Sequence, residues 1–286
     1  YGLYDLRNEF DTQRKIYDAF NGRNDENSVW IRDGLCRLVA NVLFVEDSRW
    51  PNMFHPRVQA YNALVFEALT SEERQAFMTI YNDYFYERHN EMWGALAYRK
   101  LSMVLERTNM LVTAEDLGVL PDCVQPTLDA LRILTLEVQT LPKQHGLEFA
   151  HLEANPYLSV ATISTHDMPP LRLWWQERPE AAQHYYRDRM QKEGRPPVAL
   201  TTTLAEEIVS RHLYSPSMLC LLSLQDWLAV DAEMRNPDPR SERINIPGDC
   251  YNRWSYRMHV NIEQLIADEQ LNKKLRTIVE RSKRNV

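Results

Sequence analysis

The chain has 286 residues, of which 44% are hydrophobic and 26% charged, with a formal net charge of −7. This length suits one large domain or two modest ones with a substantial core. The acidic balance and the lack of a strong basic run argue against nucleic acid as a partner, and no apolar run is long enough to span a bilayer. The four cysteines lack the regular spacing of a disulfide framework and have no CxxC motif. We therefore expect free thiols, no metal site and a cytoplasmic location.

The first third of the chain predicts two short elements followed by one long helix. Residues 12–20 have a helical period, residues 21–28 are a polar loop, and the β-rich stretch 35–46 predicts a strand pair. Thr70 to Glu73 have the sequence of a capping box, which opens a helical region to about residue 108 that Gly94 divides. We therefore expect a first subdomain over residues 1–69 and a larger body over residues 70–286.

From residue 110 onward, strands and helices alternate, which is typical of a parallel α/β arrangement. Four strands are about half of what an eight-stranded barrel needs. The connection 142–156 is long enough to be a substrate loop. The predicted strands are 110–115, 133–138, 158–164 and 218–224, and the predicted helices are 121–130, 171–177, 181–192, 205–214 and 262–281.

Two of these strands end on carboxylates. The predicted strand within residues 111–118 ends at Glu115 and Asp116. The predicted strand within residues 158–167 is followed by His166 and Asp167. A strand holds an acid at its tip in a fixed direction, and the tips of parallel strands can face one substrate. Two carboxyl groups in fixed orientations suit glycosyl transfer or hydrolysis, in which one donates a proton and the other stabilises positive charge.

Each of these residues also has a structural interpretation. Glu115 would hold its proton more easily among apolar neighbours, but it can equally be an acid that caps the next helix. Asp116 fits better as a partner of nearby backbone amides. Asp167 can accept from two sugar hydroxyls or cap a helix at residues 169–170. Trp174 can stack on a sugar or pack in the core, and Asn245 can bind hydroxyls or shape a turn.

The motifs around these residues resemble the 4-alpha-glucanotransferases, which are the amylomaltases and disproportionating enzymes of glycoside hydrolase family 77. The similarity runs from about residue 84 to residue 254, and Arg88–Trp93 is closest to the cytosolic plant enzymes and their bacterial relatives. The motifs that carry it are Ala114-Glu-Asp-Leu-Gly-Val-Leu-Pro121, Ser164-Thr-His-Asp167 with Trp174-Trp175, and Arg243-Ile-Asn-Ile-Pro-Gly248 with Trp254.

The resemblance implies an α/β fold, namely the C-terminal part of a (β/α)8 TIM barrel with helical insertions. It implies a retaining transfer of glucosyl units from maltose or maltodextrin to a glycogen-like glucan, with no cofactor. Glu115 would be the general acid/base and Asp167 the transition-state stabiliser. His166, Asn245 and Trp174 would bind substrate. Met168-Pro-Pro departs from the commoner family continuation and changes the contacts expected of that loop.

The family's nucleophile lies in an R-x-D segment that no stretch here matches, since Ile31-Arg-Asp-Gly34 reads as a turn. We therefore expect a C-terminal portion of a longer enzyme that is inactive by itself. Half a barrel also leaves open strand edges, which predicts self-association. Two other functions fit the sequence: an α-glucan hydrolase of similar fold, and a non-catalytic glucan-binding module.

Overall fold

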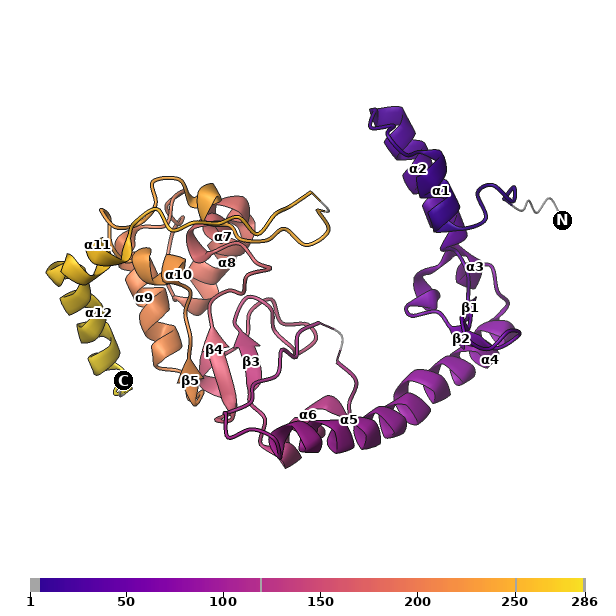
Figure 1. Ribbon diagram of the computed structural model, residues 1–286, viewed down its shortest axis with the longest axis horizontal. Coiled ribbons are helices and arrows are strands. Elements are labelled where there is room, and N and C mark those ends of the chain that lie inside the picture. The colour runs from indigo at the N-terminus through magenta and orange to yellow at the C-terminus, as the bar shows by residue number, and fades with distance from the viewer. Residues whose placement is uncertain (1–5, 119, 250, 285–286) are drawn as a thin grey trace. The chain divides into compact units, whose positions relative to one another are not determined.

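The computed structural model describes residues 6–118, 120–249 and 251–284. It divides the chain into two compact units, residues 1–93 and residues 94–286, each with a hydrophobic core of its own (Figure 1). In the ranges that the structure describes, no helix has both the length and the apolar character needed to cross a membrane.

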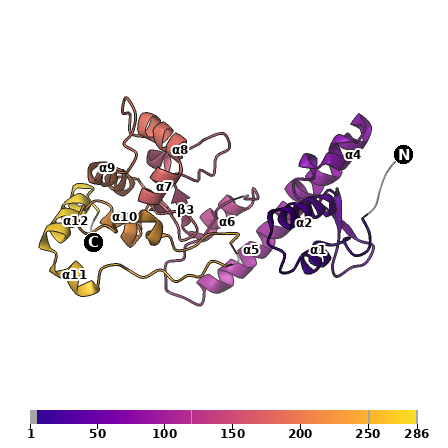
Figure 2. The ribbon, with the colours of Figure 1, turned by 90° about the horizontal axis from the view of Figure 1, so that it is seen from above.

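The first unit combines short helices with one antiparallel hairpin, in which Phe44 lies opposite Pro56. Helices α1 and α2 pack side by side (Figure 2). The buried centre consists of Ala60, Phe77 and Tyr81. The elements are α1 (Gln13–Ala19), α2 (Glu26–Val39), β1 (Phe44–Glu46), β2 (Phe54–Pro56), the 3-10 helix η1 (Ala60–Asn62), α3 (Leu64–Glu67), α4 (Ser71–Asn82) and the π-helix η2 (Asp83–Arg88).

The helix at residues 12–20 is confirmed by α1, but the strand pair predicted over residues 35–46 is wrong in its first half. Helix α2 covers that half and ends at Val39. It begins after Asp25, whose side chain accepts a hydrogen bond from the Ser28 amide at 3.0 Å. A capped first turn and apolar residues four positions apart favour a helix over a strand, in which apolar and polar residues would alternate. Only Phe44–Glu46 forms a strand.

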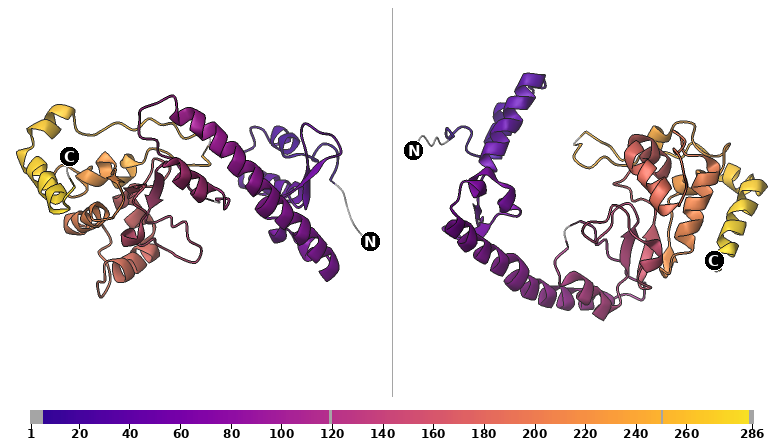
Figure 3. Two further views of the ribbon diagram at one scale, coloured as in Figure 1. Left: turned by 90° about the horizontal axis from the view of Figure 1, so that it is seen from below. Right: turned by 180° about the vertical axis from the view of Figure 1, so that it is seen from behind.

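The predicted capping box is confirmed, with the Thr70 hydroxyl accepting from the Glu73 amide and the Glu73 carboxylate accepting from the Thr70 amide. Helical residues then follow one another through α4, η2 and α5 (His89–Leu105) (Figure 3). Gly94 does not divide this helix. A Cβ at Gly94 would lie 3.3 Å from the Cβ of Cys123, so the glycine permits a close approach to the segment before α6.

The second unit contains a parallel sheet of β3 (Thr135–Val138), β4 (Ser159–Thr162) and β5 (Leu219–Cys220), in that order. Thr113 adds an isolated parallel bridge to Leu134, on the outer side of β3. The predicted parallel α/β arrangement is therefore confirmed at this level. The strand expected over residues 110–115 is reduced to that single bridge.

Helices surround this sheet, and α9 packs against β4 (Figure 1). Helix α7 has the predicted bounds, whereas residues 181–192 divide between α8 and a π-helix. The predicted closing helix breaks at Asp268, which caps α12. The remaining elements are α6 (Val124–Leu131), η3 (Leu152–Ala154), α7 (Leu171–Glu177), α8 (Pro179–His184), η4 (Tyr185–Arg189), α9 (Thr202–Leu213), α10 (Leu224–Leu228), η5 (Pro239–Glu242), α11 (Ile262–Ala267) and α12 (Glu269–Arg281).

Candidate active site

The predicted acids follow parallel strand segments at the same edge of the sheet. Glu115 comes two residues after the bridge at Thr113, and Asp167 follows the end of β4. Because both segments run parallel to β3, their carboxyl ends point to one edge of the sheet. β3 lies between them in the sheet order. The topology thus agrees with a shared edge, and convergence of the two carboxyls on one sugar ring stays a prediction.

Asp167 lies in a tight turn after β4. The Met168 amide donates to the Thr165 carbonyl at 3.1 Å, and the Asp167 amide donates to the Thr165 hydroxyl at 3.3 Å. The carboxylate accepts a short 2.5 Å hydrogen bond from Nδ2 of Asn245 at its Oδ1. Its side chain is 42% exposed, so one oxygen is held while the carboxylate remains open to solvent.

His166 shares this site with Asp167 and Trp254. Its Nε2 lies 3.5 Å from Oδ1 of Asp167, and its ring centroid lies 4.8 Å from that of Trp254. The His166 carbonyl also accepts from the Asn245 amide at 3.2 Å. Asn245 therefore holds His166 through its backbone and Asp167 through its side chain. Three residues predicted from the sequence to share a site are brought together here.

The loop that carries Asn245 is fixed on both sides of it. Asn252 donates from Nδ2 to Oδ1 of Asn245 at 2.7 Å, which directs the Asn245 amide nitrogen toward Asp167. Before it, Arg243 contacts the Glu177 carboxylate at 3.3 Å. After it, the Asp249 amide donates to the Ile246 carbonyl at 3.1 Å and closes a turn in which Gly248 has φ +90°. A left-handed residue after proline is typical of a type II turn and favours glycine.

A buried carboxylate, that of Asp226, binds residues on both sides of the Asp167 turn in the chain. Asp226 is fully buried and accepts from the Leu171 amide at 2.9 Å and from the Ser164 hydroxyl at 3.1 Å. Burial raises the pKa of this carboxyl. Leu171 is the first residue of α7, so Asp226 caps that helix from a distant part of the chain. Asp226 follows the predicted strand 218–224, and its contacts are those of a helix cap.

Glu115 and Asp116 differ sharply in their surroundings. Glu115 is exposed, so the apolar neighbours expected around its carboxyl are not what this structure gives it. Asp116 is 4% exposed and accepts from the Leu136 amide at 2.8 Å. The interpretation of Asp116 as a partner of backbone amides is therefore confirmed.

Trp174 packs against the hydrophobic core of the second unit. Its ring packs edge-on against Phe149 at 6.1 Å and Tyr185 at 5.8 Å between centroids, and it is half-buried. Trp254, by contrast, is 61% exposed and contacts His166. No role for Trp254 was predicted from the sequence, although its position after the Arg243–Gly248 segment was a signal that indicated one.

No group of three histidine, cysteine, aspartate or glutamate side chains in the described ranges is arranged to hold a metal ion. Carboxylates, imidazoles and amides, the groups found at this edge, are of the kinds that can bind sugar hydroxyls and stabilise an oxocarbenium-like charge.

Comparison with known proteins gives consistent matches. The family profile described as 4-alpha-glucanotransferase, glycoside hydrolase family 77, matches residues 28–263. The chain is 29% identical to the 4-alpha-glucanotransferase DPE2 of Oryza sativa subsp. japonica, over 99% of this chain and 30% of that protein. It is 32% identical to the 4-alpha-glucanotransferase of Chlamydia muridarum, over 62% of this chain and 34% of that protein. The chain thus spans about a third of the length of these relatives.

Among solved structures, the chain is similar to the amylomaltase from Streptococcus agalactiae in complex with acarbose. The TM-score is 0.49 at 17% identity, and the similarity covers 68% of this chain and 35% of that chain.

Proposed function

This chain belongs to the 4-alpha-glucanotransferase family, glycoside hydrolase family 77, and we propose that it carries part of the active site of a retaining glucanotransferase. The enzyme would move glucosyl units from maltose or maltodextrin to a glycogen-like glucan, without a cofactor. The observation that carries the proposal is the arrangement of Asp167, His166 and Asn245, in which a partly exposed carboxylate is held by an amide at 2.5 Å beside an imidazole.

In the proposed mechanism, Glu115 protonates the leaving glucosyl oxygen as the C1–O4 bond breaks. A carboxylate nucleophile, which the family resemblance places in an R-x-D segment not matched here, takes the sugar as an ester. Asp167 stabilises the positive charge on the ring. Glu115 then removes the proton from the acceptor hydroxyl as its oxygen bonds to C1 and the ester bond to the nucleophile breaks, which restores the free carboxylate.

The remaining residues would position the sugar. His166 can donate to a hydroxyl next to Asp167, and its 42% exposed side chain leaves it open to a ligand. Asn245 uses one amide hydrogen on Asp167, which leaves the second for a hydroxyl. Trp174 stays a proposed sugar contact from the sequence, but its packing in the core gives that role no support.

For the fold, we propose that residues 70–286 form the C-terminal half of a catalytic (β/α)8 barrel with helical insertions, and that residues 1–69 form an inserted subdomain. The parallel order of the Thr113 bridge, β3, β4 and β5 supports this arrangement. In the sequence, the two compact units of the structure meet after Trp93, which lies within the longer of these two segments. Open strand edges would favour self-association.

A cytoplasmic location also belongs to this proposal. Cys36 and Cys220 have free thiols, and burial raises the pKa of Cys220 to about 11, which keeps it unreactive. Cys250 lies outside the described residues.

The test uses the full-length protein that contains this chain, incubated with maltose and glycogen. Glucose release coupled to lengthening of the outer glycogen chains is the expected result. Glucose release without chain lengthening would favour the hydrolase, and binding of glycogen without any turnover would favour the non-catalytic module.

A further inference from the structure

The strand pairing between residues 112–114 and β3 begins as a regular parallel ladder. The Leu134 amide donates to the Val112 carbonyl at 3.0 Å, and the Ala114 amide donates to the Leu134 carbonyl at 2.8 Å. The next donor in such a ladder is the Leu136 amide, whose regular acceptor is the Ala114 carbonyl. It donates instead to Oδ1 of Asp116 at 2.8 Å. A side chain thus replaces a main-chain acceptor and ends the ladder.

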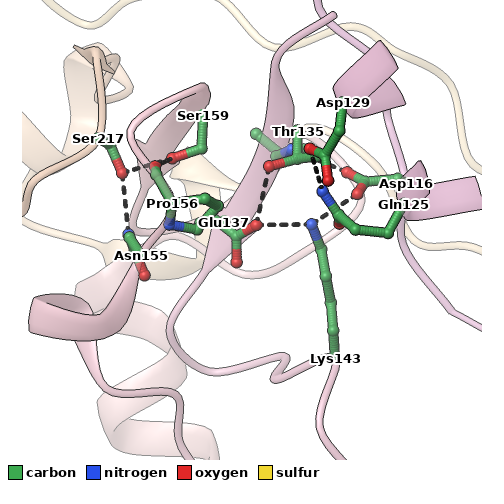
Figure 4. A network of polar contacts seen from close by, with 11 residues as sticks. Asp116, Gln125, Asp129, Thr135, Glu137, Lys143, Asn155, Pro156, Ser159 and Ser217 are labelled. Carbon is green, nitrogen blue, oxygen red and sulfur yellow. Dashed lines mark hydrogen bonds and ion pairs between the residues drawn. The ribbon is translucent and has the colours of Figure 1, made fainter. Parts of the chain in front are cut away.

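Lys143 holds that side chain in place. Its Nζ lies 2.6 Å from Oδ2 of Asp116 and 2.7 Å from Oε1 of Glu137, which also accepts from the Thr135 hydroxyl at 3.0 Å (Figure 4). The side chains of Asp116, Lys143 and Glu137 are 3%, 19% and 16% exposed. Two carboxylates this close and this little exposed repel each other unless a cation lies between them. Lys143 is that cation.

The consequence falls on Glu115. Once Asp116 is bound to β3 and to Lys143, the chain leaves the sheet, and the neighbouring Glu115 is exposed at the carboxyl edge. Had the ladder continued past Ala114, residue 115 would have been fixed within a strand. The contacts of Asp116 therefore determine where the Glu115 backbone departs from the sheet.

We propose that Asp116 and Lys143 are positioning residues for Glu115. This inference rests on the proposed function of Glu115 as general acid/base. It gives the connection 142–156 a specific role, because that connection supplies Lys143 and so anchors the segment that carries the acid. Neither residue is proposed to touch the substrate.

The first arm of the test uses the present chain and needs no activity. Hydrogen exchange at the Leu136 amide reports whether Asp116 ends the ladder. Asp116→Ala removes the acceptor, so the Leu136 amide should exchange at least about 10-fold faster than in Asp116→Asn, which also loses the charge but keeps an oxygen acceptor. Equal exchange in Asp116→Ala and the wild type would overturn the ladder-ending role.

The second arm measures transfer by the full-length protein. Lys143→Met should lower kcat about 10-fold to 100-fold with KM within about twofold, because the misplaced group acts on the reaction step and not on binding. Lys143→Arg keeps the charge and should recover most of kcat. Lys192→Met is the matched control, since Lys192 pairs with Glu207 at 3.0 Å on the surface, away from these contacts.

Equal kcat per folded molecule in Lys143→Met and Lys192→Met would overturn the positioning role. So would a rise in KM with kcat unchanged, since that would place Lys143 in substrate binding. If the wild-type full-length protein transfers no glucan, the proposed function itself fails and the role toward catalysis fails with it. The Leu136 exchange result then still decides whether Asp116 ends the strand pairing.

Discussion

Asn245 donates a 2.5 Å hydrogen bond to Asp167, although 78 residues separate them in the chain. The same residue donates its backbone amide to the His166 carbonyl at 3.2 Å. Two bonds from one residue fix both the backbone and the side chain of the His166–Asp167 turn. The segment that carries Asn245 is therefore part of the candidate site. From the same segment, Asn252 contacts Asn245 and Trp254 contacts His166.

Replacement of Asn245 should affect catalysis more than stability. In the full-length protein, Asn245→Ala removes the donor to Asp167, and we expect kcat to fall roughly 10-fold to 100-fold because the charge-stabilising carboxylate loses its fixed position. Steady-state transfer kinetics measure this. Asn272→Ala is the control, since the Asn272 amide donates at 2.9 Å to the Leu265 carbonyl in α11. An increase in KM with unchanged kcat would show that Asn245 binds the sugar without holding Asp167.

Asp226 should contribute to stability as a buried cap. Asp226→Ala leaves the Leu171 amide and the Ser164 hydroxyl without their acceptor, which should lower the free energy of unfolding by about 2–3 kcal/mol. Asp226→Asn retains one oxygen acceptor and should cost less. Urea unfolding of the chain measures both, with the exposed Glu193→Ala as control. A loss below about 0.5 kcal/mol in Asp226→Ala would rule out the capping role.

Local patterns predicted the elements whose determinants are themselves local. The capping box at Thr70 depends on residues within one turn of each other, and it is found. The helix at residues 171–177 is found as well, although its first amide is capped by the distant Asp226. The strand prediction over residues 35–46 was wrong in its first half because β-branched Val39 belongs to a helix that Asp25 caps. The strand at residues 110–115 failed for a longer-range reason, because the Asp116 side chain takes the Leu136 amide.

The site was predictable only in part for the same reason. The acids at strand ends could be found from the pattern and the family resemblance. The contact of Asn245 with Asp167 could not be derived from spacing, since nothing local couples positions so far apart. The core position of Trp174 depends on Phe149 and Tyr185, which approach it only in the folded unit.

Glu242 should make stability depend on pH. It is 1% exposed, and burial raises its pKa to about 7, although Arg172 lies 3.5 Å away and opposes that shift. Its pKa in the unfolded chain is about 4.3. Between these values folded Glu242 binds more protons than unfolded Glu242, so its contribution to stability should fall as pH rises from about 4.3 to 7 and then level off. Buried His212, whose pKa burial lowers to about 4, acts in the opposite direction. The total change attributable to Glu242 is up to about 4 kcal/mol.

Glu242→Gln tests this dependence. The variant should be more stable than the wild type at pH 8 and similar to it near pH 4.5, because glutamine carries no charge that burial penalises. Asp226, whose pKa burial also raises, contributes in the same direction and keeps part of the slope. Urea unfolding at several pH values measures the effect, with Glu193→Gln as an exposed control. A stability difference between Glu242→Gln and the wild type that stays the same from pH 4.5 to pH 8 would contradict the assignment.

Substitution of Glu115 should lower activity alone, whereas substitution of Asp116 should lower stability as well. In the full-length protein, Glu115→Gln keeps the shape of an exposed side chain and removes its proton, so transfer should fall about 10²-fold to 10⁴-fold while unfolding is unchanged. Asp116→Asn removes a buried charge that pairs with Lys143 at 2.6 Å, so unfolding should become easier by about 1–3 kcal/mol. Transfer assays and urea unfolding on the same preparations measure both. Near-normal transfer by Glu115→Gln would exclude Glu115 as the proton donor. The donor would then have to be another acidic group at the carboxyl edge of the sheet.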